Sequence, residues 1–448
     1  MFLEARMSDF RSRIQAAAQH FRPTTDWLEG TMGRVRRRKR LRRVTSAALA
    51  LVVFAGAFAL LWAALRPASN NAPAGPPACP RIWTQAAPEQ APGGFAAVSG
   101  TAPDDVWAVG PRSELRPGSQ TIIEHWNGQR WERIQSPNGA TGSNAANELH
   151  GVAALSPNDA WAVGQYTDSI GDPLRILVEH WDGKTWSIVP APNPSQTENG
   201  LEDVVASGPN DVWAVGYSVV GTHATTLVEH WDGQQWSVVP TPDVTSGGSG
   251  ADLNAISVVS ANDIWAVGSQ PSGVLIEHWD GSTWSVIDAP TPEDHAFLTG
   301  VDASGANNVW AAGWTSPNGP GNQATPPVVE HYDGTQWDIM KLPDTPAEFA
   351  VPLAVTAVSS RDVWIAGWTG ASNESDLYAE HGALVAHWDG TAWTYLDTGL
   401  DQPPQVIFGA TEALGTVVFV GSEGGSFSGM DGSLQGDRPL AVFGQCAR

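Results

Sequence analysis

Residues 201–242 read LEDVVASGPNDVWAVGYSVVGTHATTLVEHWDGQQWSVVPTP. The stretch alternates short apolar runs with turn signals, and Val and Trp fill the runs, as pleated and packed strands prefer. An Asp-Gly pair at 232–233 between two apolar runs is a strong hairpin signal. Pro240 and Pro242 then end the outer strand, which tolerates proline because it is an edge. The stretch therefore predicts four antiparallel strands, at 201–207, 212–216, 226–231 and 235–239.

The same phrase recurs along the chain. The glycine that ends its second strand returns at steps of 54, 52, 52, 45, 54 and 54 residues. A period of this size in β-type sequence is typical of propeller blades. The sequence therefore predicts an all-β, seven-bladed β-propeller of four-stranded antiparallel blades. The marking glycines are Gly110, Gly164, Gly216, Gly268, Gly313, Gly367 and Gly421.

The seventh repeat is split between the two ends of the propeller. Residues 406–421 match the first two strands and residues 440–446 match the third, but no fourth strand follows. The missing strand is at 79–88, where Trp83 stands at the position of the outer-strand tryptophan. We expect this N-terminal strand to complete the last blade and close the ring.

The two cysteines of the chain lie beside this predicted closure. Cys446 ends the third strand of the last blade and Cys79 precedes its fourth. We predict a Cys79–Cys446 disulfide, which an extracytoplasmic location permits. The loop it would close spans nearly the whole domain, and chain entropy then gives on the order of 4 kcal/mol or more. The alternative is two unpaired thiols.

The N-terminal region carries the features of a membrane anchor. Residues 1–43 hold twelve Lys and Arg against four Asp and Glu, and the 22 residues at 44–65 have no charge. This segment reaches about 33 Å as a helix, enough to cross a membrane, and 43 residues ahead of it are too many for a cleavable signal peptide. Positive charge stays inside. We expect a basic cytoplasmic tail (1–43), a transmembrane helix (44–65), a Pro-rich stalk (66–78) and an extracytoplasmic propeller (79–448) on the cell membrane.

The rest of the chain is strongly acidic. Beyond residue 43 there are twelve basic and 43 acidic side chains, because the whole chain holds 24 and 47. Nucleic-acid affinity rests on Lys and Arg, so we expect no nucleic-acid partner. The basic residues that precede the apolar segment are interpreted as marking the cytoplasmic side of the membrane rather than as a nuclear localisation signal.

Tryptophan and histidine recur at fixed positions in the repeat. An aromatic residue repeated in every blade indicates a wedge between blades, because Trp buries a large area; a ladder of sugar-stacking rings is the alternative. Equivalent histidines on an outer strand point in rotated directions, so we expect each to bond a turn Asp or a backbone group. No metal and no cofactor are expected. The histidines are His125, His180, His230, His278, His331 and His387.

The phrase Trp-Ala-Val-Gly, followed by Trp-Asp-Gly-x-x-Trp before a proline, resembles a Kelch repeat. It departs from that family in having a single Gly after the second strand and a shorter turn before the last Trp. The resemblance covers residues 79–446 and implies the propeller fold, while its motif residues are structural. The layout of basic tract, anchor and repeats also resembles bacterial surface proteins, namely those of Gram-positive soil bacteria.

Variation gathers on one face of the predicted disc. The first and third turns of each repeat are short and alike, whereas the other connections are long and different, and in a meander these two sets lie on opposite faces. Variable loops on a rigid scaffold are where binding resides. On this variable face Trp314 and Trp368, in adjacent blades, are candidates for an aromatic platform, with loop packing as the alternative. Tyr217 holds the equivalent position in the third blade.

Two further groups on this face are candidates. At the mouth of the central channel we expect Ala96, His150, Glu202, Asn254, Thr299, Leu353 and Ile407, with one side polar. Four arginines in neighbouring blades would suit a carboxylate ligand, with salt bridges to loop acids as the alternative. These are Arg112, Arg116, Arg175 and Arg438.

The sequence supports a surface binding or scaffold module for a glycan, a cell-wall polymer or a protein. No catalytic residue is assigned. The alternatives are an extracytoplasmic enzyme of the glycosidase or sialidase type, and a transmembrane sensor whose tail contacts a cytoplasmic partner.

Overall fold

The structure is a computed structural model. It describes residues 81–85, 94–111, 117–245, 250–290, 296–315, 327–344, 347, 349–371, 380–396, 405–423, 426–427, 434–435 and 438–446. The predicted tail, transmembrane helix and stalk, together with Cys79, lie outside these residues. Within the described ranges no helix is long and apolar enough to span a membrane.

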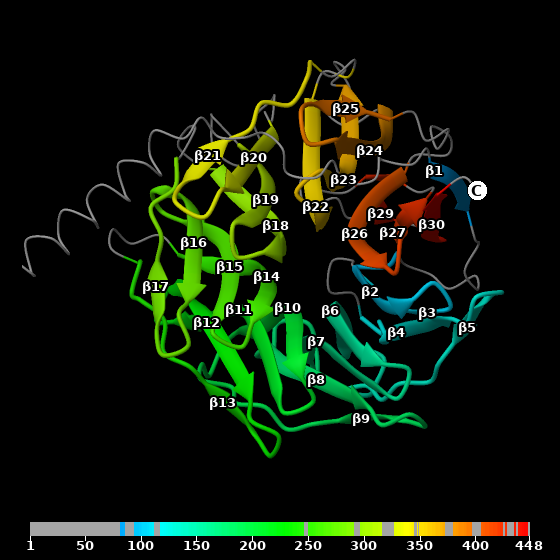
Figure 1. Cartoon of the computed structure of the whole chain (residues 1–448). Coiled ribbons are helices and arrows are strands. Elements are labelled where there is room, and N and C mark those ends of the chain that lie inside the picture. Colours follow the sequence, from blue (N-terminus) through cyan, green and yellow to red (C-terminus); the bar gives the residue numbers. More distant parts are fainter. Residues whose placement is uncertain are drawn as a thin grey trace, which may run out of the picture. The chain divides into compact units, whose positions relative to one another are not determined.

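Seven four-stranded antiparallel sheets form a ring of blades (Figure 1). Each innermost strand contacts those of the two neighbouring blades, so β2, β6, β10, β14, β18, β22 and β26 surround the centre. Blades 1 and 2 consist of β2 (Ala97–Ala102), β3 (Asp105–Gly110), β4 (Ile122–Trp126) and β5 (Trp131–Arg133), and of β6 (Ala146–Ser156), β7 (Asp159–Thr167), β8 (Arg175–Trp181) and β9 (Trp186–Ile188).

The next three blades repeat this order from the centre outward. Blade 3 consists of β10 (Asn199–Gly208), β11 (Asp211–Val220), β12 (His223–Trp231) and β13 (Trp236–Val238). Blade 4 consists of β14 (Asp252–Ser260), β15 (Asp263–Gln270), β16 (Gly273–Trp279) and β17 (Trp284–Val286). Blade 5 consists of β18 (Ala296–Gly305), β19 (Asn308–Thr315), β20 (Pro327–Tyr332) and β21 (Trp337–Ile339).

The last two blades complete the ring. Blade 6 consists of β22 (Phe349–Ser359), β23 (Asp362–Ala371), β24 (Glu380–Trp388) and β25 (Trp393–Tyr395). Blade 7 consists of β26 (Gln405–Ala413), β27 (Thr416–Glu423), β30 (Arg438–Cys446) and β1 (Arg81–Gln85). The short strands β28 (Ser426–Phe427) and β29 (Leu434–Gln435) pair with each other between β27 and β30.

The predicted closure of the ring is confirmed. Strand β1 pairs with β30 and becomes the outer strand of blade 7, with Trp83 opposite Gly444. In blade 3 the equivalent register joins Trp236 to Trp231, so Trp83 holds the outer-strand tryptophan position. Arg81 lies opposite Cys446. The described residues contain no disulfide; because Cys79 lies outside them, its pairing with Cys446 stays a prediction.

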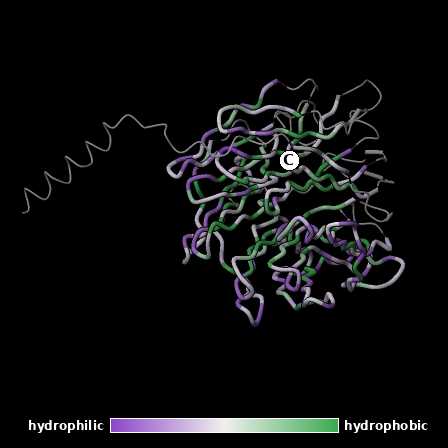
Figure 2. Tube along the Cα trace, turned by 45° about the vertical axis from the view of Figure 1, so that its right-hand side comes forward, coloured by the Kyte–Doolittle hydropathy of each residue, from purple (hydrophilic) through white to green (hydrophobic). Residues whose placement is uncertain are grey.

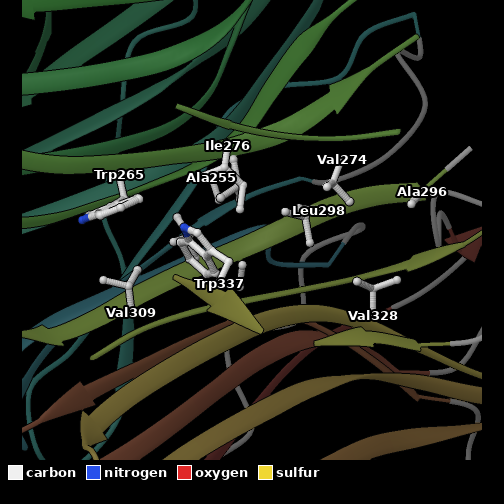
Figure 3. Packing of buried hydrophobic residues seen from close by; sticks show 12 residues of the cluster. Ala255, Trp265, Val274, Ile276, Ala296, Leu298, Val309, Val328 and Trp337 are labelled. Atoms are coloured by element: carbon white, nitrogen blue, oxygen red, sulfur yellow. The ribbon is translucent and has the colours of Figure 1, made fainter. Parts of the chain in front are cut away.

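The repeated tryptophans are wedges between blades, as predicted. Figure 3 shows Trp265 of blade 4 beside Trp337 of blade 5, with Val309 and Leu298 close by. The ring centroid of Trp265 is 5.4 Å from that of Trp337, edge-on, and 4.9 Å from that of Tyr332. Each such tryptophan in blades 1 to 5 therefore packs against two aromatic rings of the next blade: Trp107, Trp161, Trp213, Trp265 and Trp310.

The repeated histidines bond turn residues, as predicted, and do not converge. In five blades Nε2 lies 2.6–2.9 Å from the Asp that opens the second strand of the same blade, and in blade 5 His331 contacts Asn308 instead. The imidazole of His278 also packs against the ring of Trp265 at a tilt, with centroids 4.2 Å apart. Among the described residues no cluster of His, Cys, Asp and Glu is arranged to hold a metal.

Blade 7 uses apolar residues at the same positions. Val418 stands where other blades have Trp, and Phe443 lies opposite it, where they have His. The ring of Phe443 contacts Trp126 and Trp131 of blade 1, at 4.8 and 6.0 Å between centroids. Phe443 thus takes part in the hydrophobic packing between the first and the last blade.

Hydrophobic residues lie along the strands of the blades and hydrophilic residues gather in the turns, as the colours of the Cα trace in Figure 2 show. One polar residue breaks this pattern inside the blades. The third strand of blades 1 to 5 carries a fully buried glutamate, and in four of these blades neither carboxyl oxygen has a hydrogen-bond partner. Burial raises the pKa of each of these carboxyls to about 8: Glu179, Glu229, Glu277 and Glu330.

Candidate functional site

The strands extend further toward the variable face than the sequence predicts. In blade 3, β11 continues to Val220 and β12 begins at His223, so the connection between them is a tight turn. The short turns at the opposite face lie where they were expected. In blade 3 a paired strand ladder therefore reaches the variable face in place of a long loop.

A β-bulge interrupts the innermost strand of six blades near this face. In blade 3 the register skips Glu202 between Leu201 and Asp203. A bulge leaves its extra residue outside the ladder and redirects the side chain. The bulge residues of blades 2 to 7 all line the central channel, and Ala96 of blade 1 joins them: His150, Glu202, Asn254, Thr299, Leu353 and Phe408.

The predicted ring of channel residues is correct at six positions and wrong at Ile407. Ile407 pairs with Gly421 and is 0% exposed. Phe408 takes the channel position instead, because the bulge of blade 7 follows Ile407 rather than preceding it.

The channel encloses a cavity of about 460 Å³. Its mouth has two unlike halves. Blades 2 to 5 supply the polar half, with His150, Glu202, Asn254 and Thr299, while blades 6, 7 and 1 supply Leu353, Phe408 and Ala96. The predicted polar side is therefore confirmed. A cavity of this volume lies in the range of small-molecule binding sites.

His150 lies between two carboxylates. Its Nε2 is 3.4 Å from Glu148 Oε2, and its Nδ1 is 3.1 Å from Glu202 Oε2, where the alignment is too poor for a hydrogen bond and an ion pair remains. Burial lowers the pKa of His150, but the charges of Glu202 and Glu148 outweigh burial and raise it to about 10. The imidazole is therefore protonated at neutral pH.

Two aspartates in the channel wall join blades. Asp302 accepts hydrogen bonds from Ser257 of blade 4 at 3.2 Å and from the Ala357 N–H of blade 6 at 2.8 Å. Asp203 accepts from the Ile256 N–H of blade 4 at 3.0 Å. Burial raises the pKa of both, to about 7 for Asp203, although these N–H groups oppose the shift. Sequence reasoning missed both; an aspartate inside an apolar strand was the available signal.

Tyr217 lies next to the polar half. Its hydroxyl donates to Gln165 Oε1 at 3.2 Å, which joins blades 2 and 3 above Gly200. A Cβ at Gly200 would meet both side chains, so only glycine allows this approach. Burial and the nearby charge of Glu202 raise the pKa of Tyr217. Tyr217 is thus held against blade 2 beside the mouth, and it is not one of the residues that line the cavity.

Trp314 and Trp368 come together, but not as an exposed platform. Trp368 is 2% exposed and clusters with Leu353 and Phe408, and Trp314 packs against this cluster. Trp314 is half-buried and stacks on Phe297, with centroids 4.7 Å apart. The loop-packing alternative therefore describes this pair, which supports the apolar half of the mouth from behind.

The arginine cluster is only partly described. Arg175 forms an ion pair with Asp168 at 3.0 Å and lies 5.7 Å from the ring centroid of Tyr166. This is the salt bridge to a loop acid that was the alternative reading. Arg112 and Arg116 lie outside the described residues, as does the side chain of Arg438 in β30. A carboxylate site built from all four arginines stays a prediction.

Comparison with known proteins supports the fold. No family model matches the sequence, and no curated protein matches it. Among solved structures, YCF48 bound to D1 peptide is 14% identical with a TM-score of 0.50, covering 83% of this chain and 100% of that one. YCF48 from Cyanidioschyzon merolae is 14% identical with a TM-score of 0.50, covering 81% of this chain and 98% of that one.

The GH74 xyloglucanase from Xanthomonas campestris is 12% identical with a TM-score of 0.51, covering 80% of this chain and 56% of that one. Identities this low carry the propeller fold and no function. The Kelch type of the repeat stays a prediction.

Proposed function

We propose that the chain is a membrane-anchored, extracytoplasmic binding module whose ligand docks on the variable face over the channel mouth. The supporting observation is the channel cavity of about 460 Å³, because the residues at its mouth differ from blade to blade while the blades themselves repeat. The ligand classes that we consider are a glycan, a cell-wall polymer and a protein. A structurally similar propeller, YCF48, is known bound to a peptide, which favours a protein ligand.

Binding without turnover fits the carboxylates of the cavity. Asp203 and Asp302 accept hydrogen bonds from neighbouring blades, and Glu202 is ion-paired with His150. These contacts give the acids a structural role in positioning the wall. Turnover of chromogenic glycosides by the full-length chain would overturn this preference for a binding module.

Filling the mouth is expected to abolish ligand binding. We expect Asn254→Trp to weaken a ligand found by glycan-array or peptide-array screening at least tenfold, because the indole occupies the cavity. Ser237→Trp is the matched control, since Ser237 is exposed on the outer strand of blade 3 and this variant should bind normally. Equal binding by the two variants in titration calorimetry would contradict docking at the mouth.

The predicted membrane anchor and the predicted Cys79–Cys446 disulfide are tested on cells that produce the full-length chain. We expect the protein to stay in the membrane fraction after alkaline washing, since residues 44–65 carry no charge. Protease added outside should reach the propeller.

Under denaturing, non-reducing conditions a maleimide reagent should label no thiol, because Cys79 and Cys446 are paired. Two labelled thiols would contradict the disulfide, and release by the alkaline wash would contradict the anchor.

A further inference from the structure

The polar half of the mouth presents hydrogen-bond acceptors, because most of its donor hydrogens are already used. Thr299 has one hydroxyl hydrogen, and its Oγ lies 3.1 Å from the Pro352 carbonyl oxygen. Asn254 uses one amide hydrogen on the Leu298 carbonyl oxygen at 2.9 Å. Both ring nitrogens of His150 face carboxylates. An ionised carboxylate such as that of Glu202 only accepts, so the groups left for a ligand are mainly acceptors.

The charge of the channel also favours a ligand that donates hydrogen bonds, because it favours a cation. Five acidic side chains lie in or directly behind its wall, and His150 is the one cationic side chain among the described lining residues. No Lys or Arg is found among those lining residues. Acidic side chains outnumber the one cationic side chain in this wall, and an excess of negative charge attracts a positively charged ligand. The five acids are Glu148, Glu202, Asp203, Asp302 and Glu412.

The apolar half sets the second requirement. Leu353 and Phe408 face the cavity and are backed by Trp368 and Trp314. These two side chains give an aliphatic or aromatic group an apolar surface to pack against. They contribute no polar atom. A ligand matching both halves carries a donor-rich cation next to an apolar group.

We propose that the mouth binds a guanidinium or ammonium group carried beside an apolar side chain, as an arginine or lysine of a protein partner supplies. The inference rests on the proposed function and names the chemistry of its ligand. The cation lies against Glu202, Asn254 and Thr299, and the apolar neighbour lies against Leu353 and Phe408. Arg and Lys suit this acceptor-rich half because they donate hydrogen bonds and do not accept them.

The test compares a cationic peptide with its neutral isostere on the full-length chain. The probes are acetyl-Leu-Arg-Leu-amide, the same peptide with citrulline in place of arginine, and glucosamine, measured by titration calorimetry. We expect the citrulline peptide to bind at least tenfold more weakly. Glu202→Gln should weaken the arginine peptide about tenfold and leave the citrulline peptide unchanged.

Glu198→Gln is the matched control. Glu198 is exposed on the same face, four residues before Glu202, so this variant loses the same charge outside the mouth and should bind the arginine peptide within twofold. Thr299→Val removes an acceptor without touching His150 and should weaken binding about threefold. The Thr299→Val variant provides an independent test if Glu202→Gln unfolds at a lower temperature than the parent.

Three outcomes would overturn the proposal. Equal affinity for both peptides would exclude a cation, and glucosamine binding as tightly as the arginine peptide would assign the ammonium to a sugar instead of a protein. If no probe binds while Asn254→Trp still blocks the ligand found by screening, the cation chemistry is wrong and the proposed function stands. If Asn254→Trp blocks nothing, the proposed function itself fails.

Discussion

Trp265→Ala is expected to lower the free energy of unfolding by about 3–5 kcal/mol, the usual cost of truncating a buried aromatic side chain. The indole is 3% exposed and packs on Tyr332 and Trp337 of the next blade. Its Nε1 also donates to Asp263 at 2.9 Å. Alanine removes the contact between two blades as well as the area inside one. Urea unfolding followed by tryptophan fluorescence measures the loss.

Blade 7 supplies the control for this prediction. There Val418 and Phe443 replace the Trp and His, and Phe443 contacts the next blade. The double variant Trp265→Val/His278→Phe should therefore be more stable than Trp265→Val alone, and this coupling is the mark of adjacent residues. A loss below 1 kcal/mol for Trp265→Ala, or no gain from the added phenylalanine, would contradict the wedge.

The buried glutamates make the propeller more stable in mild acid than in base. Burial raises the pKa of Glu277 to about 8 from an ordinary value of 4.5, so the folded state keeps the proton over a range where the unfolded chain loses it. The stabilising contribution is complete below pH 4.5 and is lost as pH rises toward 8. One pKa unit corresponds to about 1.4 kcal/mol. We expect the free energy of unfolding to fall between pH 5 and pH 8.

Glu277→Gln isolates one such group. A neutral amide of the same shape cannot ionise, so the variant should be more stable than the parent at pH 8 by on the order of 4 kcal/mol, which is about 3.5 pKa units at about 1.4 kcal/mol each, and should differ from it by less than about 1 kcal/mol at pH 5. Glu132→Gln is the control, because Glu132 lies at the surface and pairs with Arg130. Thermal unfolding across this pH range checks both. An equal change in the two variants would contradict a buried neutral carboxyl.

The sequence was sufficient for the architecture because the repeat carries its own register. The marking glycines give the number of blades. The outer strand of the last blade, which contains Trp83 and precedes the first blade in the sequence, shows how the ring closes. The separate location of each histidine also followed from the repeat, since residues at equivalent positions in rotated blades cannot converge, while the choice between a turn Asp and a backbone group as its partner came from the structure. The transmembrane helix, disulfide and ligand class remain predictions, because Cys79 and residues 44–65 lie outside the described part of the chain.

The site was predictable only in part. The bulge residues depend on one skipped register position in each blade, and the sequence pattern misplaced it at Ile407. Burial of Trp368 was not evident either, because its cluster joins blades 6 and 7. The buried glutamates were missed because the Glu-His-Trp phrase looks like a polar edge. Such cases depend on which face of the neighbouring blade covers a residue, and no single repeat contains that information.

The pairing of β1 with β30 has a consequence for biosynthesis. The two strands are separated by residues 86–437 in the chain, so the ribosome makes one partner long before the other. At ~5–20 residues per second the delay is on the order of 20–70 s. Once residue 395 has been made, blades 1 to 6 have all their strands, yet β1 still has an unpaired edge until β30 follows, and such an edge invites pairing with the wrong chain. Helper proteins that cover exposed strands would find their substrate in this waiting period.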